Sequence, residues 1–253
     1  GDVYKRQYTN PELAKKLVEF RIQTLPGAMA NAKAYGYPGA RYPWESSVSG
    51  EEQCPNWQYA DHEIHVTADV VHGIWHYYQA AGDMEFLKNA LPVLKETARY
   101  WLARVCRKPG GAVTLDGVMG PDEYICLCNN NAYTNFMAAR SLEITAWALE
   151  LCGEAAEPGF IEDLRETAQG LMNSVDWSGV IPQCDHFEDY EEPDFETMWP
   201  DRSKPFGGQV SQEYNYRVKA LKQADVLMLP YLFPERFSAE QIRQSYDFYY
   251  PYT

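Results

Sequence analysis

A chain of 253 residues is long enough to bury a sizeable core, in one large domain or two modest ones. Its formal net charge of −14, from 22 basic and 36 acidic residues, argues against nucleic acid and anionic membranes as partners. No apolar run approaches membrane-spanning length, and no secretory signal opens the sequence. The six cysteines are scattered without paired zinc spacing, so reduced thiols and a cytoplasmic location are expected.

Aromatic residues make up 14% of the sequence, including 19 Tyr and 7 Trp. A generous core would explain this content. A sugar-binding cleft would explain it equally well, because aromatic rings with polar edges suit both environments. The composition is therefore compatible with a carbohydrate ligand without requiring one.

The N-terminal part predicts two short helical pieces. Residues 1–7 differ in character from the rest of the chain and are interpreted as an artefactual or disordered tail. Asn10 followed by Pro11 is typical of a helix start, with an amide cap and a proline at the first helical position. Pro26 interrupts this helix, and the second piece is expected to end before Gly36.

Residues 39–54 follow neither a helical nor a strand period and predict a loop. The loop holds Trp44 and Glu45 among other aromatic and charged side chains. Loops of this kind on an otherwise helical domain are where binding groups tend to lie. A solvated charged loop is the alternative, and the presence of Trp44 counts against it.

Apolar stripes then predict a helix over residues 64–78, ended by Gly82, and another over 93–105, ended at Pro109-Gly110. A strand signal follows at residues 112–115. Both helices are amphipathic, so each is expected to bury one face against a neighbour.

Histidines on the first of these helices raise the question of a metal site. His72 and His76 are four residues apart, a spacing that zinc-binding helices use. The residues between them are Gly-Ile-Trp, without the acidic partner of the His-Glu-x-x-His pattern. No metal is therefore predicted.

A Gly-Pro turn, Gly120-Pro121-Asp122-Glu123-Tyr124, carries two adjacent carboxyl groups and is followed by a run of asparagines. Such a turn projects side chains from a scaffold. A carboxyl group held there among apolar and amide neighbours is desolvated, which favours its protonated form, as a general acid at neutral pH requires. The alternative is that Asp122 and Glu123 begin a helix, where carboxylates favour the positive end of the dipole.

The rest of the chain reads as further helices and one irregular excursion. Helices are predicted at residues 134–152 (ended by Gly153), 159–175, 221–227 and from Ser238 onward, where Ser238 to Gln241 forms a capping box. Residues 176–216 are rich in Pro, Asp and aromatics and predict little regular structure, with a strand signal at 209–216. Helix pairs joined by polar loops imply an all-α fold of stacked hairpins.

Several sequence blocks together resemble glycoside hydrolase family 65, which includes maltose, kojibiose, nigerose and trehalose phosphorylases. In chain order the blocks are Gly39-Ala-Arg-Tyr-Pro-Trp-Glu-Ser46, Gly50-Glu-Glu52, Gly120-Pro-Asp-Glu-Tyr124, Asn130-Asn-Ala-Tyr-Thr-Asn135 and Lys222-Gln-Ala-Asp-Val226. The resemblance implies an (α/α)6 barrel, here a partial catalytic barrel over residues 8–253 that is truncated at both ends.

Five residues acquire roles from this resemblance. Glu123 matches the general acid of the family. Trp44 and Glu45 match one substrate-binding pair, and Lys222 and Gln223 match a second. The resemblance implies inverting phosphorolysis of an α-glucosyl disaccharide, kojibiose-like or maltose-like, to β-glucose 1-phosphate and glucose.

Two positions depart from the family pattern. Ile125 stands where members often have His, and Asn129 stands where they often have Asp. Both lie near Glu123 in the sequence, so the acceptor site and the surroundings of the acid are expected to differ from those of other members. The proposed acid itself is present.

The expected partners are a disaccharide and inorganic phosphate as co-substrate, with no other cofactor, no nucleic acid and no membrane; the full-length protein is expected to form a homodimer. One alternative is an inverting α-glucoside hydrolase of the same family, acting on kojibiose or trehalose. Inverting hydrolases need a second carboxylate that activates water, which a phosphorylase does not. Another alternative, from a different class, is an inactive truncated fragment that binds sugar at most.

Overall fold

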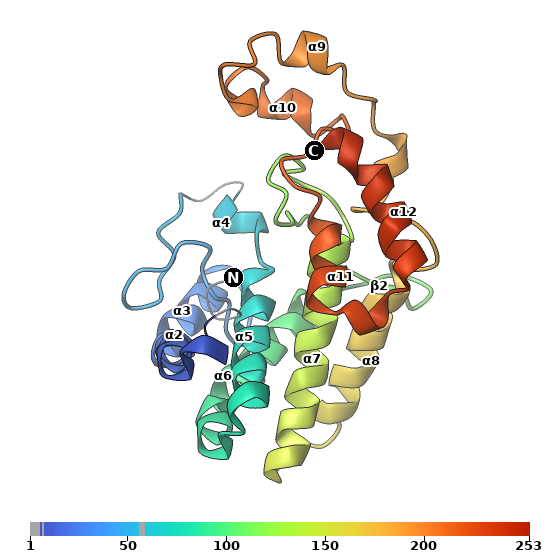
Figure 1. The fold of residues 1–253 in the computed structure, drawn as a ribbon. Coiled ribbons are helices and arrows are strands. Elements are labelled where there is room, and N and C mark those ends of the chain that lie inside the picture. Colours follow the sequence, from blue (N-terminus) through green and yellow to red (C-terminus); the bar gives the residue numbers. More distant parts are fainter. Residues whose placement is uncertain (1–5, 7, 56–58) are drawn as a thin grey trace.

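The computed structural model describes residues 6, 8–55 and 59–253, and within them the chain is predominantly helical (Figure 1). The predicted tail at residues 1–7 lies outside the described residues apart from Arg6. The longer helices are α2 (Pro11–Gln23), α3 (Leu25–Ala34), α5 (Val66–Ala81), α6 (Met84–Arg104), α7 (Ala132–Cys152), α8 (Phe160–Asn173) and α12 (Ala239–Tyr249). The all-α prediction is thus confirmed.

Side-chain caps begin two of these helices where the sequence predicts them. Asn10 Oδ1 accepts the backbone N–H at N3 of α2 at 3.1 Å, and Pro11 occupies the first helical position. Ser238 Oγ accepts the N–H of Gln241 at 3.2 Å and begins α12. The side chain of Gln241 does not complete the capping box, because its Nε2 donates to the carbonyl of Trp177 at 2.6 Å.

Helix α7 lies at the centre of the helical layer. It packs against α5, α6 and α8, which lie alongside it in Figure 1. Residues on every side of α7 are buried, as its all-round apolar sequence predicts. Gly153 and Gly82 end α7 and α5 in the left-handed conformation, which costs glycine little.

The first turns of α5 and α7 lie at the same end of this layer. The ring of His65, at the start of α5, packs edge-on against the ring of Tyr133 in the first turn of α7, with centroids 5.5 Å apart. Figure 1 shows the loop after α3, the short helix α4 (Tyr59–His62) and the loop before α7 at this end. The polar sequence blocks are therefore gathered at one end of the helices.

The end of α6 differs from the prediction. The helix stops at Arg104, because Val105 is extended and Cys106 begins a strand. Strands β1 (Cys106–Arg107) and β2 (Val113–Thr114) pair antiparallel, with Cys106 opposite Thr114. Pro109-Gly110 therefore lies in a hairpin turn and does not end the helix, whereas the strand signal at residues 112–115 is confirmed.

Two predictions in the C-terminal part are wrong. The strand predicted at residues 209–216 is replaced by short helical turns, and the helix predicted at 221–227 begins only at Asp225. Residues 176–216 are otherwise largely irregular, as predicted. The short elements of this part are η1 (Phe187–Asp189), α9 (Phe195–Met198), η2 (Phe206–Gly208), α10 (Gln212–Asn215), η3 (Asp225–Leu227), α11 (Met228–Leu232), η4 (Pro234–Arg236) and η5 (Tyr250–Tyr252), where η marks a 3-10 helix.

One large core joins the helices, and a smaller cluster lies under the excursion. The smaller cluster consists of Met198, Phe206, Val218 and Ala220. All six cysteines have free thiols. Among the described residues, no helix has both the length and the apolar character needed to cross a membrane.

Candidate active site

The turn that carries Glu123 fits closely against a buried polar cluster. A Cβ atom added to Gly120 would overlap the carboxylate of Asp225 and the side-chain amide of Asn131. Only glycine therefore allows the backbone of this turn to approach the cluster so closely. Helix α7 begins at Ala132, with Asn131 as its cap, so Glu123 is not at a helix start, and the dipole alternative is wrong.

Asp122 fixes the shape of the turn from within. Its Oδ1 accepts the backbone N–H groups of Lys222 at 2.9 Å and of Tyr124 at 3.3 Å, and its Oδ2 accepts Gln183 Nε2 at 3.0 Å. The side chain is fully buried. Asp122 thus joins three segments that are far apart in the sequence.

Asp225 holds the other side of the turn. Its Oδ2 accepts Asn131 Nδ2 at 3.0 Å and the backbone N–H of Asp122 at 3.4 Å. Burial raises the pKa of Asp225 to about 8, with the nearby Asp122 contributing, and burial raises the pKa of Asp122 to about 7. These two carboxyl groups therefore form a buried support behind the Glu123 turn.

The structure brings together three of the residues that the sequence singles out. Lys222 Nζ lies 2.8 Å from Glu123 Oε2, with the side chains 43% and 25% exposed. Gln223 Nε2 donates to the carbonyl of Pro121 at 2.7 Å. Lys222 and Gln223 are thus both held against the turn that carries Glu123.

Trp44 and Glu45 lie in the loop at residues 39–55, which the carboxylate of Glu52 closes. Its two oxygens accept the backbone N–H groups of Trp44 at 2.8 Å, Glu45 at 3.0 Å and Cys54 at 3.1 Å. The half-buried ring of Trp44 packs edge-on against the ring of His65, with centroids 5.8 Å apart, and Glu45 is exposed. Within the described residues, no hydrogen bond or ion pair joins this pair to Glu123, Lys222 or Gln223.

A residue outside the sequence blocks lies between these two groups. Glu63 is 2% exposed, and both of its carboxyl oxygens are buried without a hydrogen-bond partner among the described residues. Burial, with a contribution from the Glu123 carboxylate, raises the pKa of Glu63 to about 9. A signal was available: Glu63 directly precedes Ile64, the first residue of the apolar stripe predicted over residues 64–78.

An aromatic cleft of about 400 Å³ opens beside Lys222. Its walls include Tyr124, from the Glu123 turn, and the rings of Phe195, Trp199 and Phe206 from the excursion. Aromatic faces with a cation nearby suit a sugar, which presents both C–H surfaces and hydroxyl groups. The abundance of aromatic residues in the sequence is partly accounted for here.

The raised pKa values predict how stability depends on pH. Glu63, Asp122 and Asp225 hold protons more tightly in the folded chain than in the unfolded one, where carboxyl pKa values lie near 4. Their contribution to stability is therefore full at low pH and is lost as the pH rises from about 4 towards 9, by at most about 1.4 kcal/mol per pH unit for each group. Urea unfolding at pH 5, 7 and 9 should show a decreasing free energy of unfolding, with a shallower decrease in Glu63→Gln. A free energy of unfolding that rises over this range contradicts the assignment.

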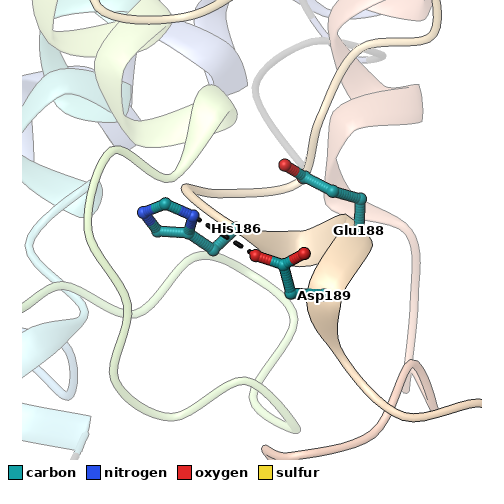
Figure 2. Close-up of side chains that lie close together, drawn as sticks. All are labelled: His186, Glu188 and Asp189. Atoms are coloured by element: carbon teal, nitrogen blue, oxygen red, sulfur yellow. Dashed lines mark ion pairs between the residues drawn. The ribbon is translucent and has the colours of Figure 1, made fainter.

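Groups that could hold a metal lie outside this arrangement. His72 and His76 stack with centroids 5.5 Å apart, and burial together with His76 lowers the pKa of His72 to about 4. Among the described residues, the group with ligand atoms close enough to share a cation is His186, Glu188 and Asp189 (Figure 2). All three side chains are exposed, with His186 Nδ1 3.5 Å from Asp189 Oδ2, and such surface groups are common without an ion.

Known proteins resemble this chain over nearly its whole length. Residues 3–253 match the glycosyl hydrolase family 65 central catalytic domain. The kojibiose phosphorylases of Halothermothrix orenii and Escherichia coli are 34% and 32% identical to the chain, over 97% of it and 35% and 34% of their own length. A kojibiose hydrolase of Flavobacterium johnsoniae is 37% identical over 71% of the chain and 26% of its own length.

A solved structure described provisionally as a kojibiose phosphorylase from the human microbiome superposes with a TM-score of 0.87 at 30% identity. It covers 98% of this chain, which in turn covers 38% of that one. The likeness agrees with a partial helical barrel, whereas the six-fold count of helix pairs stays a prediction. The chain spans about a third of the length of the curated relatives that it matches. It belongs to glycosyl hydrolase family 65 and falls within the central catalytic domain of that family.

Proposed function

We propose that this chain carries the catalytic centre of an inverting phosphorylase that cleaves an α-glucosyl disaccharide, kojibiose-like or maltose-like, to β-glucose 1-phosphate and glucose. The observation that carries the proposal is the position of Glu123, on a turn fixed by Asp122 and within 2.8 Å of Lys222. The names of the relatives, most of them disaccharide phosphorylases, support it. Inorganic phosphate is the co-substrate, no cofactor is required, and the cytoplasmic location and the homodimer stay predictions.

In this mechanism Glu123 gives its proton to the glycosidic oxygen as the bond from that oxygen to the anomeric carbon breaks. Phosphate forms the new bond to the same carbon from the opposite face, so the configuration inverts in one displacement. Phosphate brings its own nucleophilic charge, and no second carboxylate has to activate it. Glu123 becomes ionised during the step, and Lys222 at 2.8 Å is placed to stabilise that product state.

Substrate binding falls to the residues around the acid. Lys222 and Gln223 carry side chains that donate hydrogen bonds to sugar hydroxyls, and both are held against the acid turn. Trp44 offers a half-buried ring and Glu45 an exposed carboxylate from the facing loop. The match to the family pattern supports these roles, as does the gathering of both segments at one end of the helical layer.

The test uses the protein expressed from its natural start codon to its natural stop codon. Kojibiose, nigerose, maltose and trehalose are each incubated with and without phosphate, and glucose 1-phosphate and glucose are measured. We expect one disaccharide to be cleaved only when phosphate is present, which also identifies the linkage. Glucose released at the same rate without phosphate contradicts the proposal.

A hydrolase of the same family is the second candidate. The observation that favours it is the 37% identity to a kojibiose hydrolase, a higher identity than that of either kojibiose phosphorylase. A hydrolase needs a second carboxylate across the sugar ring, roughly 6.5–9.5 Å from the acid, to activate water. Glucose release that does not depend on phosphate, lost on removal of one further carboxylate, would establish it.

Replacing Trp44 by alanine should raise KM for the disaccharide about tenfold with a smaller change in kcat, because a stacking face for the sugar is lost. Trp44→Phe is the matched control, since it keeps an aromatic face and should raise KM less. Steady-state kinetics of the three proteins measure this. An unchanged KM in the alanine variant makes Trp44 a packing residue of the loop.

A further inference from the structure

Glu63 is a buried group near Glu123 for which the phosphorolysis mechanism has no use. Both of its oxygens are buried, and neither has a hydrogen-bond partner among the described residues. Leaving a polar group in this state costs free energy, and in native proteins such a group usually has a ligand or a role that explains it. The surrounding contacts indicate which ligand.

Glu63 lies where the segments of the site meet. The backbone carbonyl of the preceding residue, His62, accepts the N–H of Met119 at 3.0 Å, so this stretch runs beside the Glu123 turn. The charged groups that act on Glu63 are Glu123, Lys222 and Glu52. They come from the acid turn, the Lys222-Gln223 segment and the loop that carries Trp44, so the carboxyl group is near all three parts of the site.

Burial is the main reason that the protonated form of Glu63 is favoured, and the neighbouring carboxylates add to it. Two of the three, Glu123 and Glu52, are carboxylates, and the one cation, Lys222, is already paired with Glu123 at 2.8 Å. A second buried negative charge beside them is unfavourable, so the group is a neutral carboxylic acid at neutral pH. A neutral acid has one O–H donor and one carbonyl acceptor, which is the pattern that a pair of sugar hydroxyls complements.

We propose that Glu63 contacts the substrate directly, as a neutral carboxylic acid that donates a hydrogen bond to one hydroxyl of the disaccharide and accepts one from another. The inference rests on the proposed function for the class of ligand, an α-glucoside. It adds a specificity-determining residue to the site. The unpartnered oxygens are then the two atoms that the sugar satisfies.

The test compares wild type, Glu63→Gln and Glu63→Leu by calorimetric titration with the four disaccharides in phosphate-free buffer, where binding is measured without turnover. Glutamine keeps a donor and an acceptor, so its affinity should stay within about fivefold of wild type. Leucine has neither and should weaken binding about 10- to 100-fold. Glu143→Leu, on α7 and ion-paired with Arg140 outside the site, is the matched control and should bind as wild type does.

Monodeoxy analogues of the bound disaccharide separate a direct contact from a structural role. At least one analogue should bind wild type more weakly and yet show no further loss in Glu63→Leu, since the partner of that hydroxyl is already absent. Equal losses for every analogue in both proteins would overturn the proposal, as would wild-type affinity in Glu63→Leu.

If the leucine variant does not fold, the dependence of disaccharide binding on pH tests the proposal instead. Wild type should lose affinity above about pH 9, as Glu63 ionises, and Glu63→Gln should not. Wild type and Glu63→Gln share the neighbouring groups Glu123, Lys222 and Glu52, so a difference between their pH profiles is due to Glu63. Identical pH profiles contradict the inference.

The outcomes also separate this inference from the proposed function. If cleavage depends on phosphate and Glu63→Leu does not affect it, the proposed phosphorylase activity is supported and the proposed contact of Glu63 with the sugar is contradicted. If Glu63→Leu abolishes sugar binding but the wild-type protein releases glucose without phosphate, the contact of Glu63 is supported and the phosphorylase activity is contradicted. A wild-type protein that binds none of the four disaccharides contradicts both.

Discussion

Replacing Glu123 by glutamine is expected to lower kcat for disaccharide phosphorolysis by about 10² to 10⁴-fold while leaving the affinity for the sugar largely unchanged. The amide keeps the shape of the side chain but has no acidic proton for the glycosidic oxygen, and general acid catalysis contributes a factor of this size. The turn is held through Asp122, so its geometry should survive the substitution. Steady-state kinetics and calorimetric binding measure the two effects separately.

The leaving group provides a sharper control. A nitrophenyl α-glucoside releases nitrophenolate, which leaves without being protonated, so Glu123→Gln should retain far more of the wild-type rate on this substrate than on a disaccharide. Glu143→Gln, which alters a carboxylate away from the site, should leave both rates unchanged. If Glu123→Gln cleaves the disaccharide at the wild-type rate, the acid is another residue.

The second large effect is expected from Gly120→Ala. The added methyl group would overlap Asp225 and Asn131, both of which are buried and fixed by hydrogen bonds. Neither can yield easily, so the free energy of unfolding should fall by about 3 kcal/mol. The turn would also be displaced from the cluster, and kcat should fall with it, because a shift of about 1 Å in a catalytic group can cost about a hundredfold.

Gly179→Ala is the matched control for this substitution. No atom of the described residues lies within 4 Å of the position that a Cβ would take at Gly179, and its backbone is outside the left-handed region. Stability and kcat should both stay close to wild type. A Gly120→Ala protein as stable and as active as the Gly179→Ala protein would mean that the turn is not packed as described. Urea unfolding and initial rates compare the two.

The helices could be predicted because their signals are local. Asn10 and Ser238 cap α2 and α12 through their own side chains, and Gly153 ends α7 by its own conformation. The wrong predictions occur where contacts with a distant part of the chain determine the backbone conformation. The stretch at 221–224 has a helical composition, yet the N–H of Lys222 and the side chain of Gln223 bond to the Glu123 turn about a hundred residues earlier, so the backbone stays irregular.

The same distinction applies to the site. Glu123, Lys222 and Gln223 could be selected from sequence blocks, and the structure brings them together, although their roles stay predictions. Asp225 stands in one of the sequence blocks but received no role there, and the structure shows it fully buried, with hydrogen bonds from Asn131 and Asp122. Glu63 was given no role, although it directly precedes a predicted apolar stripe, because its burial depends on segments that meet only in the folded chain.

The most direct test of the account is the anomeric configuration of the sugar phosphate formed at the start of the reaction. Proton NMR of the first turnovers, recorded before the products equilibrate, distinguishes β- from α-glucose 1-phosphate by the coupling of the anomeric proton. A single displacement by phosphate, with Glu123 as the acid, predicts the β anomer from an α-glucosyl disaccharide. Initial formation of the α anomer, or of glucose without any sugar phosphate, would contradict it.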